Sequence, residues 1–404
     1  MKVLMLGWEL PPHNSGGLGV ACYQLCRALA RRDVAIEFIV PYRANHGIDF
    51  MRLTAASPQH VEDVLRSGIA YDSIKYVLSD GSEAEYNIFD QQGLYEAAVA
   101  RMVKRREYDI IHAHDWLTFR AGLRAREILG RPLVLHVHSI EADRAGGRGG
   151  NPLVRDIEWV AFHMADRIIA ISDLTRQAIA REYGIPPEKI DVIHNGIERD
   201  DLIPADPPLA TTYQYLAALR AQGYRVVVNI GRLTIQKGLP NLLRAAQLVV
   251  EKHPKTMFLI VGSGEQYTEL IELAADLGIA KHVIFTDFQR GKPWRDAYAI
   301  GDLFVMPSIS EPFGLTPLEA AGYGTPALIS KQSGVSEVLR HALKVDYWDV
   351  NEMANQIIAV MQHDALRDEL VTNAARELDS ISWSKAADKV CSLYNRCVPA
   401  GAPA

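Results

Sequence analysis

The chain has 404 residues, of which 48% are hydrophobic and 23% are charged, with a formal net charge of -6 at pH 7. This composition is ordinary for a globular protein, and the acidic balance argues against a general nucleic-acid-binding protein. The length exceeds what one hydrophobic core serves, so we expect two domains of about 200 residues each.

The first predicted elements indicate an α/β domain that is wound in both directions. Val3–Leu6 is a short buried strand, and a loop rich in proline and glycine follows it. A helix is expected from about Leu18 to Arg31, and Ile36–Pro41 is the second strand. This order opens a doubly wound parallel sheet. The loop lacks G-x-G-x-x-G, so it is not a dinucleotide fingerprint.

The cysteines and the apolar runs indicate in which cellular compartment we expect the protein. Cys22 and Cys26 are one helical turn apart on an apolar face, which favours buried thiols over a metal site. Cys391 and Cys397 complete a set with no disulfide framework, so we expect a cytoplasmic protein. No stretch reaches the roughly 20 apolar residues that a membrane span needs.

The helix expected at 94–103 and the residues after it include a basic region. Its cations are interrupted by acidic residues, so a solvated helix face is favoured over peripheral membrane contact. They are Arg101, Lys104, Arg105, Arg106, Arg120, Arg124 and Arg126.

Two apolar strands then end in polar residues. The runs 108–116 and 132–139 place Asp115 and His138 at their carboxyl ends, and parallel strands bring such ends to one edge. The repeated His-x-His spacing could suggest a metal, but no cysteine or carboxylate motif stands nearby, and we predict no metal site.

The remaining elements complete two domains. A glycine-rich segment at 140–155 is expected to be a mobile loop, and the first domain ends near residue 200. Residues 201–223 are expected to be a linker. The second domain, 224–381, repeats the α/β rhythm. A last helix at about 382–397 is capped by Ser382.

The stretch 310–320 is the most informative part of the sequence. Proline and glycine place Glu311 on a loop. Thr316 is expected to be a helix N-cap, with Pro317 at the first position and Glu319 at the third. Backbone N–H groups at such a helix start suit a phosphate. Alternatively, Glu319 forms a capping box with Thr316.

This E-x7-E stretch resembles the signature of retaining nucleotide-sugar glycosyltransferases of family 4. A second stretch, 229–238, resembles that family's G-R-L-x-x-x-K-G motif. The resemblance implies the GT-B fold, with two Rossmann-like domains facing across a cleft and the last helix crossing back to the first. It implies that Glu311 faces the donor sugar and Glu319 the ribose, while Arg232 and Lys237 grip the diphosphate. A structural ion pair is the alternative for these two cations.

The family pattern implies further site residues. Gly16 and Gly17 correspond to its phosphate-facing loop, although they alone also fit a tight turn. Asp115 corresponds to a residue that contacts the transferred sugar in glycogen and starch synthases, and His138 to a histidine near the anomeric centre. The remaining donor-binding positions that it implies are Asn195, Gly262, Gly264, Phe288, Phe313, Gly314, Leu315, Thr316 and Glu319. Asn195 with Gly196 otherwise fits a simple turn.

These features predict sugar transfer from an ADP- or UDP-sugar to a glycan, without cofactor. No Asp-x-Asp motif is present to hold a metal, so the leaving phosphate must be stabilised by cations and N–H donors. No nucleophile stands out, which favours front-face transfer with retention. Trp8-Glu9, Gly16-Gly17-Leu18 and His114-Asp115-Trp116 favour glucose and an α-glucan acceptor. A cell-surface polysaccharide, a small acceptor, a GT-B epimerase and an inactive scaffold remain alternatives.

Overall fold

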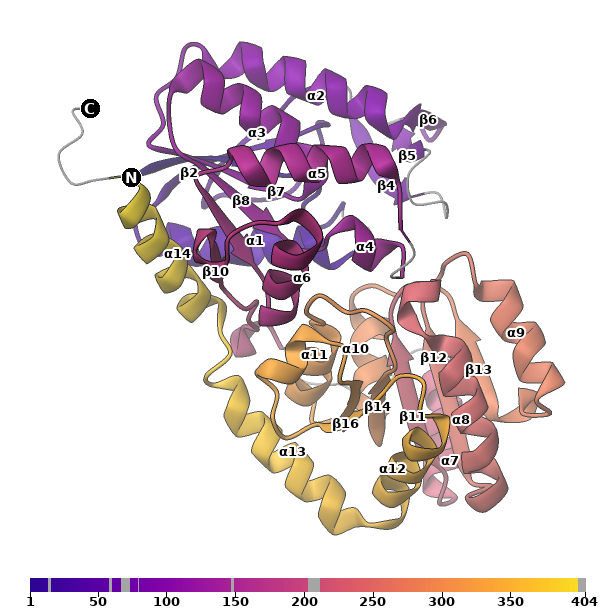
Figure 1. Cartoon of the computed structure of the whole chain (residues 1–404). Coiled ribbons are helices and arrows are strands. Elements are labelled where there is room, and N and C mark those ends of the chain that lie inside the picture. The colour runs from indigo at the N-terminus through magenta and orange to yellow at the C-terminus, as the bar shows by residue number, and fades with distance from the viewer. Residues whose placement is uncertain are drawn as a thin grey trace. The chain divides into compact units, whose positions relative to one another are not determined.

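The chain divides into two compact units. The computed structural model describes residues 1–13, 16–57, 60–66, 73–78, 80–146, 149–202 and 211–398. The first unit consists of Met1–Gly196 and Trp383–Ala404, and the second of Ile197–Ser382. Each unit is built around its own parallel sheet, and Figure 1 shows both. Two parallel α/β units agree with the fold class that the sequence predicts.

The sheet of the first unit has seven parallel strands in the order β10-β9-β8-β7-β1-β2-β3. Its central strands are short apolar runs buried on both faces, as parallel sheets require. The strands are β1 (Lys2–Leu6), β2 (Ala35–Val40), β3 (Arg52–Ala55), β7 (Ile110–His114), β8 (Leu133–Val137), β9 (Arg167–Ala170) and β10 (Ile190–Val192). Since β2 and β7 flank β1, the winding direction reverses there, and ligands bind at the carboxyl ends of such strands.

A small antiparallel sheet and the helices complete the first unit. The small sheet consists of β4 (Val61–Arg66), β5 (Ser73–Leu78) and β6 (Glu83–Asn87). The helices are α1 (Gly17–Ala30), α2 (Ile88–Val103), α3 (Trp116–Leu129), α4 (Glu141–Arg144), α5 (Pro152–Met164), α6 (Asp173–Tyr183) and α14 (Trp383–Cys397). Helices α2, α3 and α5 lie side by side over the sheet (Figure 1), while α1 packs against α14.

The glycine-rich segment at 140–155 is more ordered than the sequence predicts. It contains α4 and the first turn of α5, and its residues 147 and 148 lie outside the described part. Glu141 is buried, and its carboxylate accepts a hydrogen bond from the N–H of Asn151 at 2.6 Å. Arg144 donates to the buried Glu158 at 2.5 Å. This buried network, which a glycine count does not reveal, fixes both ends of the segment.

The second unit has six parallel strands in the order β13-β12-β11-β14-β15-β16. They are β11 (Arg225–Ile230), β12 (Thr256–Val261), β13 (Val283–Thr286), β14 (Leu303–Met306), β15 (Ala327–Ser330) and β16 (Leu343–Val345). The helices are α7 (Thr211–Ala221), α8 (Leu239–Lys252), α9 (Tyr267–Asp276), α10 (Lys292–Ala299), α11 (Thr316–Gly322), α12 (Val350–Gln362) and α13 (Asp364–Leu378). The winding reverses at β11, which lies between β12 and β14.

Helix α7 occupies much of the segment that the sequence analysis treats as a linker. Its side chains Tyr213 and Leu216 are buried, so this helix is packed against the second unit rather than extended between domains. The prolines at 204, 207 and 208 that suggest the linker lie outside the described residues.

Candidate active site

In the second unit, two motifs far apart in sequence meet at the point where the winding reverses. A 3₁₀ turn at Ile235–Lys237 follows β11, and the loop at 307–311 follows β14. The N–H of Ile309 donates to the carbonyl of Gln236 at 2.8 Å, and the Gln236 side chain donates to the carbonyl of Ser310 at 2.9 Å. These hydrogen bonds hold the two loops, and therefore the two motifs, next to each other.

Gly238 permits this close approach. Its φ is 66°, in the left-handed region that favours glycine, and a Cβ there would lie 2.2 Å from the carbonyl oxygen of Pro307. Any side chain at this position would therefore push the two loops apart. The fold therefore requires glycine at position 238, the last residue of the G-R-L-x-x-x-K-G motif, whether or not a ligand is bound.

Lys237 and Glu311 form an ion pair at the junction of the two loops. Lys237 Nζ donates to Glu311 Oε2 at 2.5 Å, and the buried Ser308 hydroxyl donates to the same oxygen at 3.1 Å. The side chains are 21% and 11% exposed, so the pair is open to a ligand at its edge. The ion pair that the sequence analysis gave as an alternative is present, and it joins two predicted site residues. Arg232 lies nearby in sequence and is exposed.

The loop that carries Glu311 is anchored along its length. Glu311 N–H donates to the carbonyl of Gln332 at 3.0 Å, and its own carbonyl accepts from Gly334 N–H at 2.9 Å. Phe313 is only 2% exposed, so its ring is a core side chain rather than a ligand contact. Gly314 has a φ of 98°, and Leu315 is the residue before α11.

The predicted capping of α11 is wrong. Thr316 is the first helical residue, Leu315 is the N-cap, and no side chain caps the helix. Glu319 therefore stands one position too far into the helix for a capping box. Its Oε2 instead accepts a hydrogen bond at 2.7 Å from the hydroxyl of Tyr298 on α10. The capping-box alternative for Glu319 is thus excluded by the tertiary structure.

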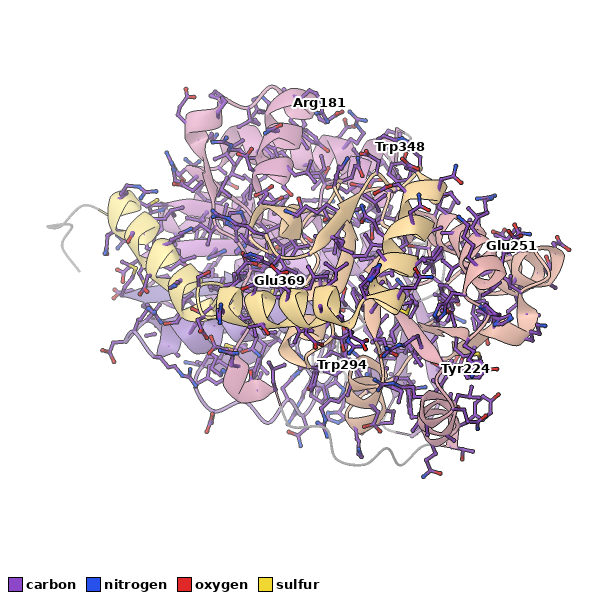
Figure 2. All side chains as sticks on the ribbon, turned by 90° about the horizontal axis from the view of Figure 1, so that it is seen from below. Arg181, Tyr224, Glu251, Trp294, Trp348 and Glu369 are labelled. Atoms are coloured by element: carbon purple, nitrogen blue, oxygen red, sulfur yellow. The ribbon has the colours of Figure 1, made fainter. Side chains whose placement is uncertain are left out.

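Glu319 lies in an environment that resists its ionisation. The buried Tyr298 ring stacks on Tyr323 at 5.8 Å between centroids, and Trp294, which is labelled in Figure 2, meets both rings edge-on. Burial raises the pKa of Glu319 to about 7, and the hydrogen bond from Tyr298 opposes that rise. At neutral pH this carboxyl is poised between its protonated and ionised forms.

The glycines after β12 serve a close contact between backbones. A Cβ on Gly262 would lie 1.8 Å from the carbonyl oxygen of Gly231, and one on Gly264 would lie 2.3 Å from that of Leu233. The loop therefore packs on the loop that carries Arg232. Helix α9 begins at Tyr267, so Gly262 and Gly264 lie before its N-terminus.

Phe288 is exposed on the loop after β13. Its side chain is 51% exposed, and the Arg290 guanidinium lies 5.1 Å from the ring centroid. An exposed aromatic ring on a loop is available to stack on a flat ligand, which is compatible with the predicted place beside the nucleotide base.

In the first unit, Asp115 and His138 meet at the carboxyl ends of β7 and β8. Asp115 Oδ1 accepts hydrogen bonds from the N–H of His138 at 2.6 Å and from the N–H of Ser139 at 3.4 Å. Asp115 has a φ of 56° and a ψ of 169°, a conformation that costs a non-glycine residue on the order of 1–3 kcal/mol. The structure thus uses this carboxylate to position the His138 backbone.

Four histidines form a buried column across β7 and β8. The rings of His112, His114, His136 and His138 stack or tilt on one another at 4.4–5.3 Å between centroids. Burial lowers the pKa of each ring, and that of His138, the half-buried outermost one, to about 3. All four are therefore neutral at physiological pH. The innermost ring, His112, is paired through Nδ1 with the Tyr394 hydroxyl of α14 at 2.5 Å.

The sequence has no cysteine motif beside the histidines, but the fold brings one cysteine close to them. The Cys22 Sγ on α1 lies within 4.8 Å of ring nitrogens of His114 and His138. Sequence spacing could not show this contact, because α1 and the two strands meet only in the folded unit. Tyr298 and Ser308 were missed for the same reason, since nothing in their local sequence marks them.

The other predicted residues of the first unit have simpler surroundings. Gly17 is the first residue of α1, and Gly16 is an extended N-cap without a neighbour within 4 Å of a Cβ placed there. The two residues before Gly16 lie outside the described part. Asn195 is 5% exposed on the segment after β10, so little of its side chain is left for a ligand in this structure.

Comparisons with known proteins match both halves of the chain. Residues 15–201 match the family model described as Glycosyltransferase Family 4, and residues 217–377 match the one described as Glycosyl transferases group 1. A D-inositol 3-phosphate glycosyltransferase from Gordonia bronchialis is 30% identical, over 95% of this chain and 85% of its own length.

Solved structures share the whole architecture. The sucrose-phosphate synthase from Thermosynechococcus elongatus superposes with a TM-score of 0.75 at 19% identity, covering 98% of both chains. Anabaena HepE in complex with UDP and glucose superposes with a TM-score of 0.72 at 20% identity, covering 98% of this chain and 100% of that one. These matches confirm the predicted GT-B fold. The two family models and the 30% identical relative show the broader family and not specifically glycogen synthases. Among the described helices, none is long and apolar enough to cross a membrane.

Proposed function

The chain belongs to glycosyltransferase family 4 and is a retaining glycosyltransferase, and from this premise we propose that it moves a sugar from a UDP-sugar to a hydroxyl of a small acceptor. The observation that carries the proposal is the junction of Lys237 and Glu311 at the reversal point of the second sheet. A cation and a carboxylate held together there suit the two parts of a nucleotide sugar, because the cation can bind its anionic diphosphate and the carboxylate can accept hydrogen bonds from its sugar hydroxyls.

On the donor side, binding of the diphosphate competes with the ion pair. We propose that Lys237 turns from Glu311 to the phosphate oxygens and that Arg232 contributes a second positive charge. Glu311 is then released to accept hydrogen bonds from sugar hydroxyls, with the Ser308 hydroxyl still orienting its Oε2. In the same proposal, the Glu319 carboxylate accepts hydrogen bonds from the ribose hydroxyls, and the Phe288 ring stacks on the nucleotide base.

In the first unit, we propose that the neutral His138 faces the sugar near its anomeric carbon. A neutral imidazole forms hydrogen bonds without adding positive charge to a centre that already develops oxocarbenium character. Asp115 acts as a positioning residue, because its Oδ1 accepts the backbone N–H groups of His138 and Ser139. This role differs from the direct sugar contact that the sequence analysis expects.

The chemical step needs stabilisation of a leaving nucleotide diphosphate. Fixed cations provide it through Arg232 and Lys237, because negative charge grows on the phosphate as the glycosidic bond breaks. Retention is compatible with front-face transfer, in which the leaving phosphate accepts the proton of the acceptor hydroxyl. This route uses no enzyme nucleophile, and the sequence offers no obvious one.

The acceptor is where the proposal departs from the sequence analysis. That analysis favours an α-glucan, whereas the curated relatives that this chain matches at 28–30% identity are named for transfer to D-inositol 3-phosphate. We therefore propose a small polyol or sugar phosphate as the acceptor. An α-glucan is the second candidate, and the run His114-Asp115-Trp116, which resembles glycogen and starch synthases, favours it.

The test is a panel of donors and acceptors. Nucleotide release is measured for UDP- and ADP-sugars with inositol phosphates, with hexose phosphates, with glycogen, and with excess chelator. We expect release from a UDP-sugar that depends on a small phosphorylated acceptor and persists in the chelator. Release stimulated only by glycogen would replace the small acceptor with a glucan. Activity that requires added Mg²⁺ or Mn²⁺ would refute stabilisation by the protein's own cations.

A further inference from the structure

Three side chains from separate elements converge behind the outermost histidine. Cys22 on α1, His114 at the end of β7 and His138 after β8 place a sulfur and two ring nitrogens within 4.8 Å of one another. His114 Nδ1 and His138 Nε2 are 3.0 Å apart. Cys22 and His114 are buried, while His138 is half-buried and gives the cluster its outer face. The proposed transfer reaction uses neither Cys22 nor His114.

The donor set matches a borderline-soft metal ion. Zinc takes thiolate sulfur at about 2.3 Å and imidazole nitrogen at about 2.0–2.1 Å in tetrahedral geometry. Those lengths separate two nitrogens by roughly 3.4 Å and a nitrogen from a sulfur by roughly 3.6 Å. The nitrogen pair needs to open by only a few tenths of an ångström, and the sulfur, which lies within 4.8 Å of both nitrogens, needs to move inward by no more than roughly 1.2 Å. Neutral imidazole is the form that binds metal.

The charges around Cys22 also favour a bound cation. Burial raises the pKa of the Cys22 thiol, and the neighbouring Cys26, Asp115 and Glu9 raise it further. The same charges that disfavour a bare thiolate stabilise a divalent ion, because one thiolate and two neutral imidazoles leave the complex with a charge of +1. Nearby negative charge then offsets the +1 charge of the complex, which the buried site could not otherwise accommodate.

A second group, His112, His114 and His136, also brings three ring nitrogens together, but its chemistry is less suitable. This group is fully buried, without an anionic ligand. Since both groups share His114, only one of them can hold an ion.

We propose that Cys22, His114 and His138 form a binding site for Zn²⁺, with the fourth position open to water or to an incoming ligand. A bound ion links α1 to the ends of β7 and β8. It also occupies the ring nitrogen of His138, which then cannot contact the sugar. If His138 faces the sugar as proposed above, an ion here inhibits transfer. That consequence rests on the proposed function, whereas the binding itself does not.

Cobalt(II) substitution tests the site directly. The purified, metal-free full chain is titrated with Co²⁺, and the absorption spectrum is recorded. We expect tetrahedral d–d bands together with a thiolate-to-cobalt charge-transfer band in the near ultraviolet. Cys22→Ser should abolish the charge-transfer band and weaken Zn²⁺ binding by more than the roughly 10–100-fold that loss of an outer partner costs. Cys26→Ser is the matched control, since Cys26 is buried one turn further along the same helix but lies outside the cluster.

Each outcome decides the proposal. The charge-transfer band in the wild type and in Cys26→Ser, with its loss in Cys22→Ser, supports it. Absence of Co²⁺ binding, a spectrum unchanged in Cys22→Ser, or d–d bands without a thiolate band overturns it. If Cys22→Ser fails to fold, X-ray absorption of the zinc-loaded wild type decides instead: one sulfur in the first shell supports the site, and only nitrogen and oxygen refutes it. Inhibition of nucleotide release by Zn²⁺, reversed by chelator, is measured separately, so a failure of the proposed function leaves the spectroscopic test intact.

Discussion

The protonation of Glu319 makes its proposed role measurable through pH. Its pKa is raised to about 7 by burial, so the fraction in the ionised form changes about tenfold between pH 6 and pH 8. If only the carboxylate accepts the ribose hydroxyls, the apparent affinity for UDP scales with that fraction. We therefore expect UDP to bind the wild type about tenfold more weakly at pH 6 than at pH 8.

Glu319→Gln removes the charge but keeps an oxygen that accepts the Tyr298 hydroxyl. Loss of a charge-assisted hydrogen bond costs roughly 1.5–3 kcal/mol, which corresponds to a 10- to 150-fold weaker affinity at pH 8. At pH 6, where the wild type is mostly protonated, the difference should shrink by about tenfold. Calorimetric titration of UDP at both pH values measures all four affinities. The variant also corrects for titration of the nucleotide itself, which is common to both proteins.

Tyr298→Phe gives an independent check on the direction of the effect. The Tyr298 hydroxyl lowers the pKa of Glu319, so removing it should move the midpoint of the affinity profile above pH 7. The wild type should also lose stability without ligand as the pH rises from about 4.5 to 7, because the folded protein holds a proton there that the unfolded chain releases. Parallel pH profiles for wild type and Glu319→Gln, with equal affinities at pH 8, would remove Glu319 from the nucleotide site.

Lys237→Met should lower the transfer rate about 10²–10³-fold and also lower the melting temperature, because it leaves the Glu311 carboxylate without its cation. Adding Glu311→Gln should restore the melting temperature but not the rate. A double variant whose melting temperature does not recover would show that the ion pair does not stabilise the fold. Gly238→Ala should destabilise the protein by more than the roughly 1 kcal/mol expected for Gly278→Ala. Both glycines have positive φ, but only at Gly238 would a Cβ meet a backbone oxygen. Equal unfolding free energies of the two variants in urea titrations would contradict this. Tyr394→Phe should lower the unfolding free energy by about 1–3 kcal/mol in the same assay, because it leaves the buried Nδ1 of His112 without its hydrogen bond. An unchanged unfolding free energy would mean that a water molecule replaces the hydroxyl.

Local sequence determined the type and order of most elements. Apolar runs of four to six residues mark nearly all the strands of the two parallel sheets, and α8 shows apolar residues at helical spacing. The edge strands β3 and β16, which are short and only partly buried, were not predicted. The helix at 211–221 was taken for linker because the prolines before it dominate the local signal.

The reaction class was also determined by sequence, because its two motifs keep their spacing within single loops. Lys237 and Glu311 each stand in a motif whose glycines and prolines can be recognised without any knowledge of the fold. The structure adds that the two loops are hydrogen-bonded to each other and that the lysine and the carboxylate are partners before any ligand arrives. Motif residues of this kind are predictable because the constraint on each is local.

Contacts between elements were decided only by the tertiary structure. The alternative of a helix cap for Glu319 rested on Thr316, three residues away, yet the hydrogen-bond partner of Glu319 is Tyr298, 21 residues earlier on another helix. Cys22 is 92 residues from His114 and 116 from His138, and no periodicity connects them. Period and spacing describe one element at a time, whereas pKa values and ligand sets depend on burial and on neighbours that the sheet order brings together. That is why the chemistry of the motifs could be predicted from the sequence, and the state of Glu319 and the cysteine–histidine cluster could not.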